Sequence, residues 1–463
     1  MVGRDASTWG FDSGYRANRT LVSTLLAMAV EVQIVRAAET ALGRSLRAAR
    51  VEPMTGGHSW DTYLVSTASG PEAVVRVAPR GGTLAPYDVE VERRALRAAR
   101  GAVPAPDVLL VAAHPSEFGA PLQVQTVAPG ERLRSSQDIP LQERKRYRAA
   151  MAVALGDLHR SGDPSRLSAV KTTAEAIRTI IDVEVEHYCR AAAVRHPGFE
   201  IGLRWLLSNL PEGNDEPVVC HGDYRIGNIL WDDGGEISAV LDWERAWAGD
   251  PMCDIAFTRQ FSAWGGIDGE AVALYERASG RVVDESLMDF YLRLERWRSY
   301  TASMRGISAL ASGKSDRVAL AAIGEAGNSG MWDLASWLED GLVPLPPGLA
   351  QRPSHYAPML SAARRIEIAR HPGTGGPLRS HLLDDQEATR ALRRSVDRLR
   401  AIGGMPDLAR ALDVSDLEAA WEAAFEVLTA AAADGGRNLQ GALLALGLRF
   451  TGRPTFLQEM AWR

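Results

Sequence analysis

Cysteine is scarce in this chain of 463 residues, which contains only three. Cys189, Cys220 and Cys253 show no CxxC spacing, so the sequence favours neither a disulfide framework nor a cysteine-based zinc site. A reducing cytoplasm is therefore the location we expect. Internal repeats and low-complexity segments are also missing from the sequence.

The chain lacks an excess of basic residues. Its 52 Lys and Arg face 58 Asp and Glu, for a formal net charge of -6. Proteins that bind nucleic-acid backbones concentrate Lys and Arg, so we expect no nucleic-acid partner. A long membrane-spanning run is missing too. Leu21–Val30 resembles a signal-peptide core, but no convincing cleavage site follows, and charges interrupt the apolar residues up to Leu42, so we predict an amphipathic helix and no membrane partner.

The residues that are abundant are those of an ordinary globular protein, with 46% hydrophobic and 24% charged. The length suits two or three structural units. Pro129-Gly130 marks one break, after which the pattern becomes almost wholly helical, and the proline-rich segment Gly341–Pro353 marks a second. We predict an α+β protein with a helical extension (1–50), a small unit (51–128), a large helical unit (129–340), a linker (341–358) and a helical C-terminal module (359–463).

The small unit is predicted to begin with a β-hairpin. Val51 and the extended segment Thr62–Ser66 flank a turn at Gly56-Gly57. The backbone N–H groups of this turn could cradle phosphates, but an ordinary hairpin turn explains the same residues. Further elements are expected in this order: a strand over Ala73–Val77, a helix over Asp88–Arg100, and strands over Val108–Val111 and Leu122–Val127.

The large unit shows helical periodicity. Met151, Leu155 and Leu158 share one face of a helix that ends near Gly162. His159, at its end, is either a packing residue or a catalytic one. Asp250 is a predicted N-cap with a proline at the first helical position. Further helices are expected within 171–210, 271–310 and 318–338, with Trp297, Trp332 and Trp337 as core or pocket aromatics.

The most informative stretch runs from Cys220 to Glu244. Asp223 and Asn228 have the D-x-x-x-x-N interval of kinase catalytic loops. A glycine-containing turn follows, which predicts a hairpin that returns Asp242 beside Asn228. Asp223 can orient a hydroxyl and take its proton late, while Asn228 and Asp242 offer the oxygen ligands that Mg²⁺ prefers. The pattern predicts phosphoryl transfer.

Three segments carry a resemblance to a known family: His221–Asn228, Leu241–Glu244 and Gly249–Asp254. They resemble the aminoglycoside phosphotransferase and choline kinase superfamily, and are closest in wording to the kinase-like domains associated with acyl-CoA dehydrogenases. The resemblance extends over about 51–340 and leaves out the final segment. It implies a bilobal protein-kinase-like fold with a small β-rich lobe and a large helical lobe, which uses ATP or GTP and Mg²⁺.

The resemblance also implies a role for each matching residue. Asp223 would be the catalytic aspartate, assisted by Asn228. Asn228 and Asp242 would bind the metal. His221 and Asp254 would support the loop. The nucleotide would be held by Gly56, Gly57, Arg76, Glu92, Gln125 and Val127, with Arg76 and Glu92 as a cation–carboxylate pair and the last two in the interlobe hinge.

Some of these residues have alternative interpretations. Many kinases have Lys where this chain has Arg76, which could instead lie on a solvated strand edge. Glu92 could be a surface charge of its helix. Arg225 and Glu244 either line the site or stabilise loops, and the cysteines at 220 and 253 have the character of buried packing residues.

We therefore expect an ATP- and Mg²⁺-dependent phosphotransferase that acts on a hydroxyl group of a small molecule. A hydroxyacid or hydroxyacyl thioester, an aminoglycoside, a macrolide, a sugar and an amino alcohol remain open as acceptors. The alternative is a nucleotide-binding regulatory or scaffold protein without turnover, which acts through its C-terminal helices. Residues 359–463 are expected to pack on the large unit or on a second copy, as in a homodimer.

Overall fold

The computed structural model describes residues 30–54, 59–79, 81–84, 87–114, 119–133, 139–191, 197–213, 215–261, 266–311, 315 and 320. These residues form two compact units. The first comprises the described parts of Met1–Thr55, Asp61–Val77 and Val108–Val127, and the second comprises the rest. Gly56, Gly57, Trp332, Trp337 and the predicted C-terminal module lie outside the described residues.

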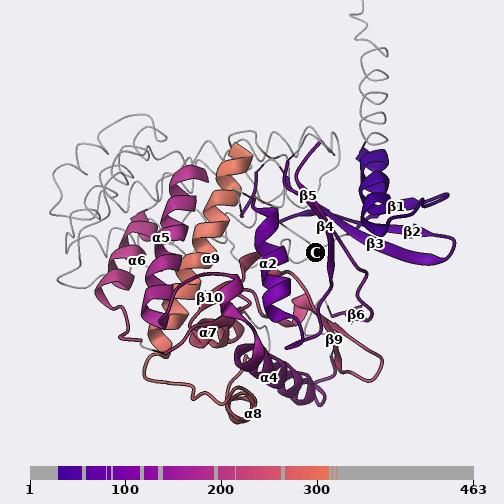
Figure 1. The fold of residues 1–463 in the computed structure, drawn as a ribbon. Coiled ribbons are helices and arrows are strands. Elements are labelled where there is room, and N and C mark those ends of the chain that lie inside the picture. Colours follow the sequence, from indigo (N-terminus) through magenta and orange to yellow (C-terminus); the bar gives the residue numbers. More distant parts are fainter. Residues whose placement is uncertain are drawn as a thin grey trace, which may run out of the picture. The chain divides into compact units, whose positions relative to one another are not determined.

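The first unit is built on a five-stranded antiparallel sheet (Figure 1). Its strands follow the order β1-β2-β3-β5-β4. Their bounds are β1 Arg50–Pro53, β2 Asp61–Thr67, β3 Gly70–Val77, β4 Val108–Ala112 and β5 Leu122–Gln125. The predicted hairpin is confirmed, because β1 and β2 pair directly with Val51 opposite Val65.

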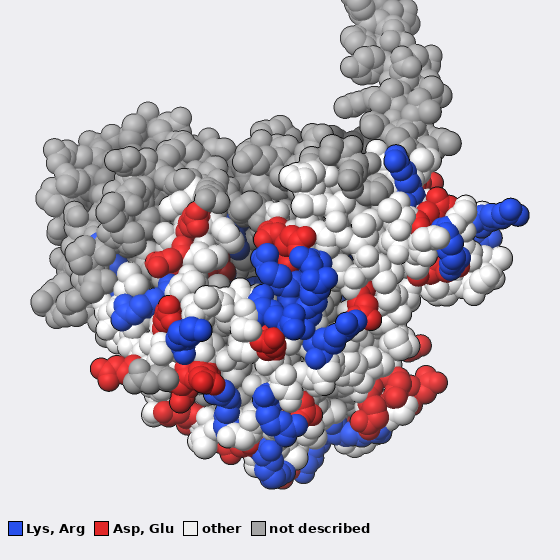
Figure 2. Space-filling view, in the orientation of Figure 1, with Lys and Arg blue, Asp and Glu red and all other residues white. Residues whose placement is uncertain are grey.

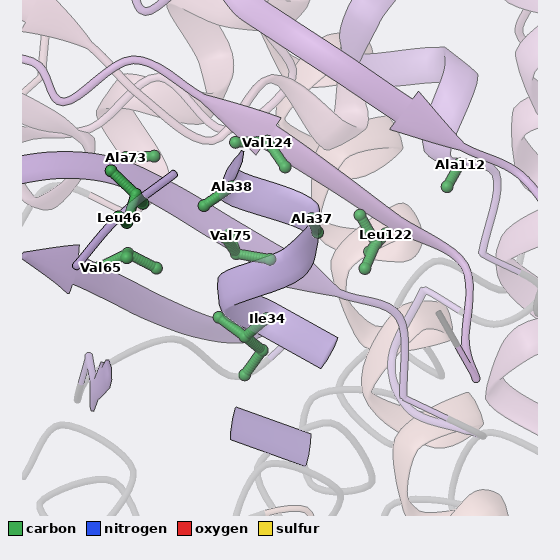
Figure 3. Packing of buried hydrophobic residues seen from close by; sticks show 10 residues of the cluster. All are labelled: Ile34, Ala37, Ala38, Leu46, Val65, Ala73, Val75, Ala112, Leu122 and Val124. Carbon is green, nitrogen blue, oxygen red and sulfur yellow. The ribbon is translucent and has the colours of Figure 1, made fainter. Parts of the chain in front are cut away.

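A helix over residues 30–42 covers this sheet (Figure 3). Ile34, Ala37 and Ala38, which share one helical face, are buried together with strand residues such as Val65 and Val75. Arg36, the charged residue between them, is exposed on the other face, so the apolar face is buried against the sheet. The predicted amphipathic helix is confirmed over these residues, and its function is to complete the core of the first unit.

The second unit is mainly helical. Its helices are α2 Val89–Ala99, α4 Arg144–Ser161, α5 Thr173–Ala191, α6 Pro197–Ser208, α7 Pro251–Phe261, α8 Glu270–Ser279 and α9 Met288–Ala311. Two small antiparallel sheets accompany them, β10-β7 and β6-β8-β9. Their strands are β6 Glu131–Arg132, β7 Val218–Cys220, β8 Ile229–Trp231, β9 Ile237–Val240 and β10 Trp247–Gly249. The helical pattern over 271–310 contains two helices, since α8 ends at Gly280.

Helix α2 belongs to the second unit, although the predicted segment 51–128 contains it. Asp88 caps its first turn by accepting a hydrogen bond from the backbone N–H of Glu90 at 2.9 Å. At its other end, the carbonyl of Ala98 accepts from the backbone N–H of Asp163 at 2.8 Å. The second contact joins α2 to the segment that follows α4, and the domain boundaries remain predictions.

Charges of both signs are interspersed on the face shown in Figure 2. Basic side chains gather over α2, which carries Arg93, Arg94 and Arg97. Two of them form ion pairs with neighbouring carboxylates, Arg93 with Glu90 and Arg94 with Asp88. Among the described residues, no helix is both long and apolar enough to cross a bilayer.

Candidate active site

The centre of the candidate site is the loop that follows β7. Gly222 adopts a positive φ of +76°, and a Cβ atom there would collide with the carbonyl group of Arg245. Only glycine meets both conditions without strain. The backbone N–H groups of His221 and Gly222 donate to the carboxylate of Asp254 at 2.7 and 2.8 Å. The chain therefore turns sharply just before Asp223.

Asp254 is held in turn by a buried network. It lies in the first turn of α7, whose N-cap Asp250 accepts from the backbone N–H of Met252 at 2.9 Å. His159 of α4 contacts Asp254 Oδ2 at 3.1 Å through Nε2 and Tyr275 at 2.8 Å through Nδ1. Burial acts to raise the pKa of the Asp254 carboxyl, but the hydrogen bonds and the neighbouring histidines lower it below its ordinary value.

The same geometry answers the question left open for His159. Its side chain is fully buried and both ring nitrogens are engaged within the protein. Nearby, the Sγ of Cys220 donates to the carbonyl of Asp250 at 3.2 Å, and burial raises the pKa of this thiol. Although His159, Cys220 and Asp254 lie close enough to share a metal, their contacts are those of a packed structural network.

Asp223 is oriented by two neighbours. Nε of Arg225 donates to its Oδ1 at 3.0 Å, and Nδ2 of Asn228 donates to its Oδ2 at 2.8 Å and to its carbonyl at 3.0 Å. The carboxylate is 19% exposed. Since an ionised carboxylate can accept about four hydrogen bonds, Asp223 keeps acceptor capacity for a further donor.

The hairpin β8-β9 brings Asp242 back beside Asn228, as the turn between the strands predicts. The backbone N–H of Leu241 donates to the carbonyl of Asn228 at 2.8 Å. Asp242 then adopts a left-handed conformation, with φ 62° and ψ 58°. Such a backbone is uncommon outside glycine and occurs most often for Asn and Asp, frequently at functional sites.

Arg132 of β6 lies at the point where the side chains of Asn228 and Asp242 meet. Its Nη2 donates to Oδ1 of Asn228 at 2.9 Å and to Oδ2 of Asp242 at 3.4 Å. Its Nε donates to the carbonyl of Gly227. Two predicted metal-binding oxygens therefore converge on one cationic nitrogen atom, a donor set that suits Mg²⁺, which binds few protein ligands and keeps waters or phosphates.

Two guanidinium groups balance the carboxylates of Asp223 and Asp242. Arg225 contacts Asp223, and Arg132 contacts Asp242. Burial acts to lower the pKa of Arg225, but attraction to Asp223, Asp242 and Glu244 raises it above its usual value. Arg225 therefore lines the site, one of the two interpretations of its sequence position.

His221 connects the two halves of the site. Its Nδ1 accepts from the backbone N–H of Asp223 at 3.2 Å, and its Nε2 lies 2.9 Å from the carbonyl of Leu241. These contacts fit the tautomer that carries its proton on Nε2. The ring of Trp243 packs against it with centroids 4.6 Å apart. His221 thus links the backbone of Asp223 to Leu241, the residue before Asp242.

The predicted nucleotide-binding residues lie in both units. Arg76 lies on β3, which pairs with a strand on each side, and its exposed fraction is only 6%. The alternative that Arg76 lies on a solvated strand edge is therefore wrong. Glu92 on α2 is 1% exposed, which also excludes a surface charge. Gln125 ends β5 and is buried, while Val127 is half-buried. Arg76 belongs to the first unit and Glu92 to the second, and their pairing stays a prediction.

The sequence patterns did not identify Arg132 as a site residue. It lies in a two-residue strand, far from the motifs, and 96 positions before Asn228. The adjacent Pro129-Gly130 turn was the only local signal. Gly130 has φ +107°, and a Cβ there would overlap Ser238 and lie 2.7 Å from the carbonyl of Trp231. The absence of a side chain at Gly130 lets the turn before β6 approach β8 this closely.

An orienting aspartate, an amide and carboxylate that converge on a cation, and a braced loop are the parts of a phosphoryl-transfer site. The sequence pattern of the phosphotransferase enzyme family (APH) matches residues 50–291, more than half of the chain. The chain therefore belongs to the phosphotransferase enzyme family. The predicted resemblance is confirmed, and with it the α+β fold class with a β-rich and a helical unit.

Individual relatives match over shorter segments. Mouse acyl-CoA dehydrogenase family member 10 is 30% identical over 210 residues, which are 44% of this chain and 19% of that protein. Chicken acyl-CoA dehydrogenase family member 11 is 40% identical over 78 residues, 17% of this chain and 10% of that protein. The match thus spans a fifth or less of these curated relatives. The solved structure of aminoglycoside phosphotransferase APH(4)-Ia has 18% identity and a TM-score of 0.47, covering 67% of this chain and 99% of that one.

Proposed function

We propose that this protein transfers the terminal phosphoryl group of ATP to a hydroxyl group of a small molecule in a Mg²⁺-dependent reaction. The observation that carries the proposal is the convergence of Asp223, Asn228 and Asp242 in one hydrogen-bonded set. Phosphoryl transfer needs an oriented hydroxyl and positive charge on the phosphates, and little covalent work from the protein.

Asp223 is the residue that receives the acceptor hydroxyl. One of its oxygens is paired with Arg225 and the other with Asn228, so the carboxylate is held in one orientation. A carboxylate held in this way suits a group that orients the hydroxyl and takes the proton late.

Asn228 and Asp242 are the residues that would hold Mg²⁺. The amide of Asn228 has only one arrangement here, with Nδ2 toward Asp223 and Oδ1 toward Arg132 and Asp242. The bound ion supplies positive charge for the phosphate oxygens. Arg225 adds a fixed positive charge beside the reacting hydroxyl.

The nucleotide is proposed to contact Arg76, Glu92, Gln125 and Val127. Two observations support this. Arg76 and Glu92 are both buried charges at the positions where the family resemblance expects the nucleotide-binding pair. Nε2 of Gln125 is buried without a hydrogen-bond partner among the described residues, so a ligand group could satisfy it. ATP is the proposed phosphoryl donor, and GTP is kept as a second donor to be tested.

Several acceptors remain possible, and the experiment must test them in parallel. Two relatives are named after acyl-CoA, so hydroxyacids and hydroxyacyl thioesters come first in the panel. Aminoglycosides, macrolides, sugars and amino alcohols follow. The three free cysteines support assaying the protein under the reducing conditions of a cytoplasm.

The test is transfer of label from γ-labelled ATP to each acceptor by wild type, Asp223→Ala and Asp233→Ala. Asp233 lies on the exposed hairpin turn and is the matched control. We expect Asp223→Ala to lose about a hundredfold or more of the rate and Asp233→Ala to keep it. Full activity of Asp223→Ala would refute the mechanism. Tight ATP binding without transfer to any acceptor would favour the scaffold alternative.

A further inference from the structure

Arg132 occupies the position between the two proposed metal ligands. The same nitrogen atom, Nη2, lies 2.9 Å from Oδ1 of Asn228 and 3.4 Å from Oδ2 of Asp242. A single cation that bridges an amide oxygen and a carboxylate oxygen has the contacts that a divalent ion would make with this pair. The metal and Arg132 therefore compete for the same oxygens.

The backbone of Arg132 is fixed, so this contact is built into the fold. Arg132 pairs with Leu230 in the β6-β8 ladder. The turn before it is held by Ser238, whose hydroxyl donates to the carbonyl of Pro129 at 2.7 Å. Only the side chain, which is 28% exposed, is left to move. The guanidinium can therefore leave the two oxygens without any rearrangement of β6.

The charges of the site favour this competition. Asp223 is paired with Arg225, and Asp242 is paired with Arg132. A divalent ion that arrives alone meets a guanidinium at its ligands, and the two positive charges repel each other. When the ion arrives with a nucleotide, the negative charges of the phosphates compensate the positive charges of both the metal and the released guanidinium.

We propose that Arg132 is a positioning residue that holds the oxygens of Asn228 and Asp242 together in the nucleotide-free protein, and that it makes divalent-cation binding depend on bound nucleotide. This inference rests on the proposed function, because it takes these two residues as the metal ligands. It assigns to Arg132 a role in the order of binding, separate from the transfer step.

The test measures binding of Mn²⁺, as a spectroscopic probe for Mg²⁺, to the full chain by electron paramagnetic resonance. Titrations are made without nucleotide and with ADP, after correction for Mn²⁺ bound by ADP in solution. Arg132→Gln removes the charge and should bind free Mn²⁺ about tenfold tighter or more than wild type. ADP should tighten Mn²⁺ binding by a larger factor in wild type than in this variant.

Two variants serve as controls. Arg132→Lys keeps the charge, and its affinity for free Mn²⁺ should stay as weak as that of wild type. Arg146→Gln removes an arginine that contacts Gly234 and Glu236 of the same hairpin, outside the site, and should also behave as wild type. If Arg132→Gln does not fold, Arg132→Met tests the same expectation. Unchanged or weaker Mn²⁺ binding after removal of the charge would overturn the inference.

Asp242→Asn separates this inference from the proposed function. If Mn²⁺ affinity with ADP is the same in Asp242→Asn and wild type, the metal ligands are wrongly assigned and the proposed function fails. If Asp242→Asn weakens Mn²⁺ binding while Arg132→Gln leaves the affinity for free Mn²⁺ unchanged, the metal site stands and only the role of Arg132 is wrong.

Discussion

Asn228 donates a hydrogen bond from Nδ2 to Oδ2 of Asp223 at 2.8 Å, and this contact couples the proposed base to the proposed metal site. The other atom of the same amide, Oδ1, faces Arg132 and lies on the side of Asp242. The planar amide of Asn228 thus orients the carboxylate of Asp223 with one atom and places its oxygen at the proposed metal site with the other. Disturbing it should affect both acceptor positioning and metal binding.

Asn228→Leu should reduce the transfer rate at least about a hundredfold, because an apolar group of similar size removes both contacts. The Mg²⁺ concentration needed for half-maximal rate should rise as well. Asn209→Leu is the control, since Nδ2 of Asn209 donates to the carbonyl of Trp205 at the end of α6. Steady-state kinetics over a range of Mg²⁺ concentrations checks both effects. A lower rate with unchanged Mg²⁺ dependence would remove Asn228 from the metal site.

Arg76 and Glu92 should behave as a coupled pair in nucleotide binding. Arg76→Gln should weaken ATP binding about tenfold or more, while Arg76→Lys should keep part of the affinity, because it keeps the charge but loses the planar fork. In a double-mutant cycle with Glu92→Gln, calorimetry should show a coupling energy of about 1 kcal/mol or more. Additive effects would show that the two residues act independently.

Asp254→Asn should destabilise the protein by roughly 3 kcal/mol at neutral pH. Its carboxylate accepts from two backbone N–H groups and contacts His159, and an amide cannot satisfy all of them. Because the folded-state pKa of Asp254 is lowered, its stabilising contribution is complete above the unfolded pKa of about 4 and is lost as the pH falls through the folded value.

Urea unfolding of wild type and Asp254→Asn from pH 7 downward checks this. The difference in the free energy of unfolding should be constant down to about pH 4 and should shrink below it. Asp233→Asn, an exposed aspartate on the hairpin turn, should show no such difference. A difference that disappears between pH 7 and pH 5 would contradict the lowered pKa.

Glu184→Gln should destabilise the protein by about 3–5 kcal/mol, because it removes a carboxylate that pairs with two buried arginines, of which only Arg298 has a second carboxylate partner, Glu295, among the ion pairs of the described residues. Glu184 on α5 lies 3.7 Å from Arg298 Nε and 3.3 Å from Arg305 Nη1, both on α9. Burial acts to raise the pKa of Glu184, but these arginines and Arg245 lower it. For Arg305 the balance is different, since burial lowers its pKa and its attraction to Glu184 does not offset this.

The matched control for this prediction is Glu236→Gln. Glu236 pairs with Arg146 at 3.3 Å, but its side chain is 70% exposed, so its loss should cost about 0–1 kcal/mol. Chemical denaturation of both variants provides the comparison. Equal, small losses would indicate that the buried arginines find other partners or water.

The C-terminal module predicted for residues 359–463 can be tested by truncation after Ala350. We expect the truncated protein to lose stability or to change its size in solution, because the apolar faces predicted for this module need a partner surface. Analytical ultracentrifugation and thermal unfolding measure the two effects. A truncated protein of unchanged stability and oligomeric state would refute the packing.

Several elements could be predicted because the interactions that form them are local. The spacing of Asp223 and Asn228, the hairpin that returns Asp242 and the N-cap at Asp250 all depend on hydrogen bonds between residues close in the chain. The sequence by itself therefore determined the order and chemistry of the site. It also determined the amphipathic helix that covers the first sheet, since one helical face is apolar.

Other features depended on contacts between distant segments. Arg132 reaches Asn228 across 96 positions, and only the pairing of β6 with β8 brings them together. Arg76 is buried on β3, which lies between two neighbouring strands, and no local pattern specifies either fact. The sequence determined which groups carry the chemistry. The tertiary structure decided that Arg132 lies among them, because the position of an isolated arginine depends on long-range packing and not on its spacing from the motifs.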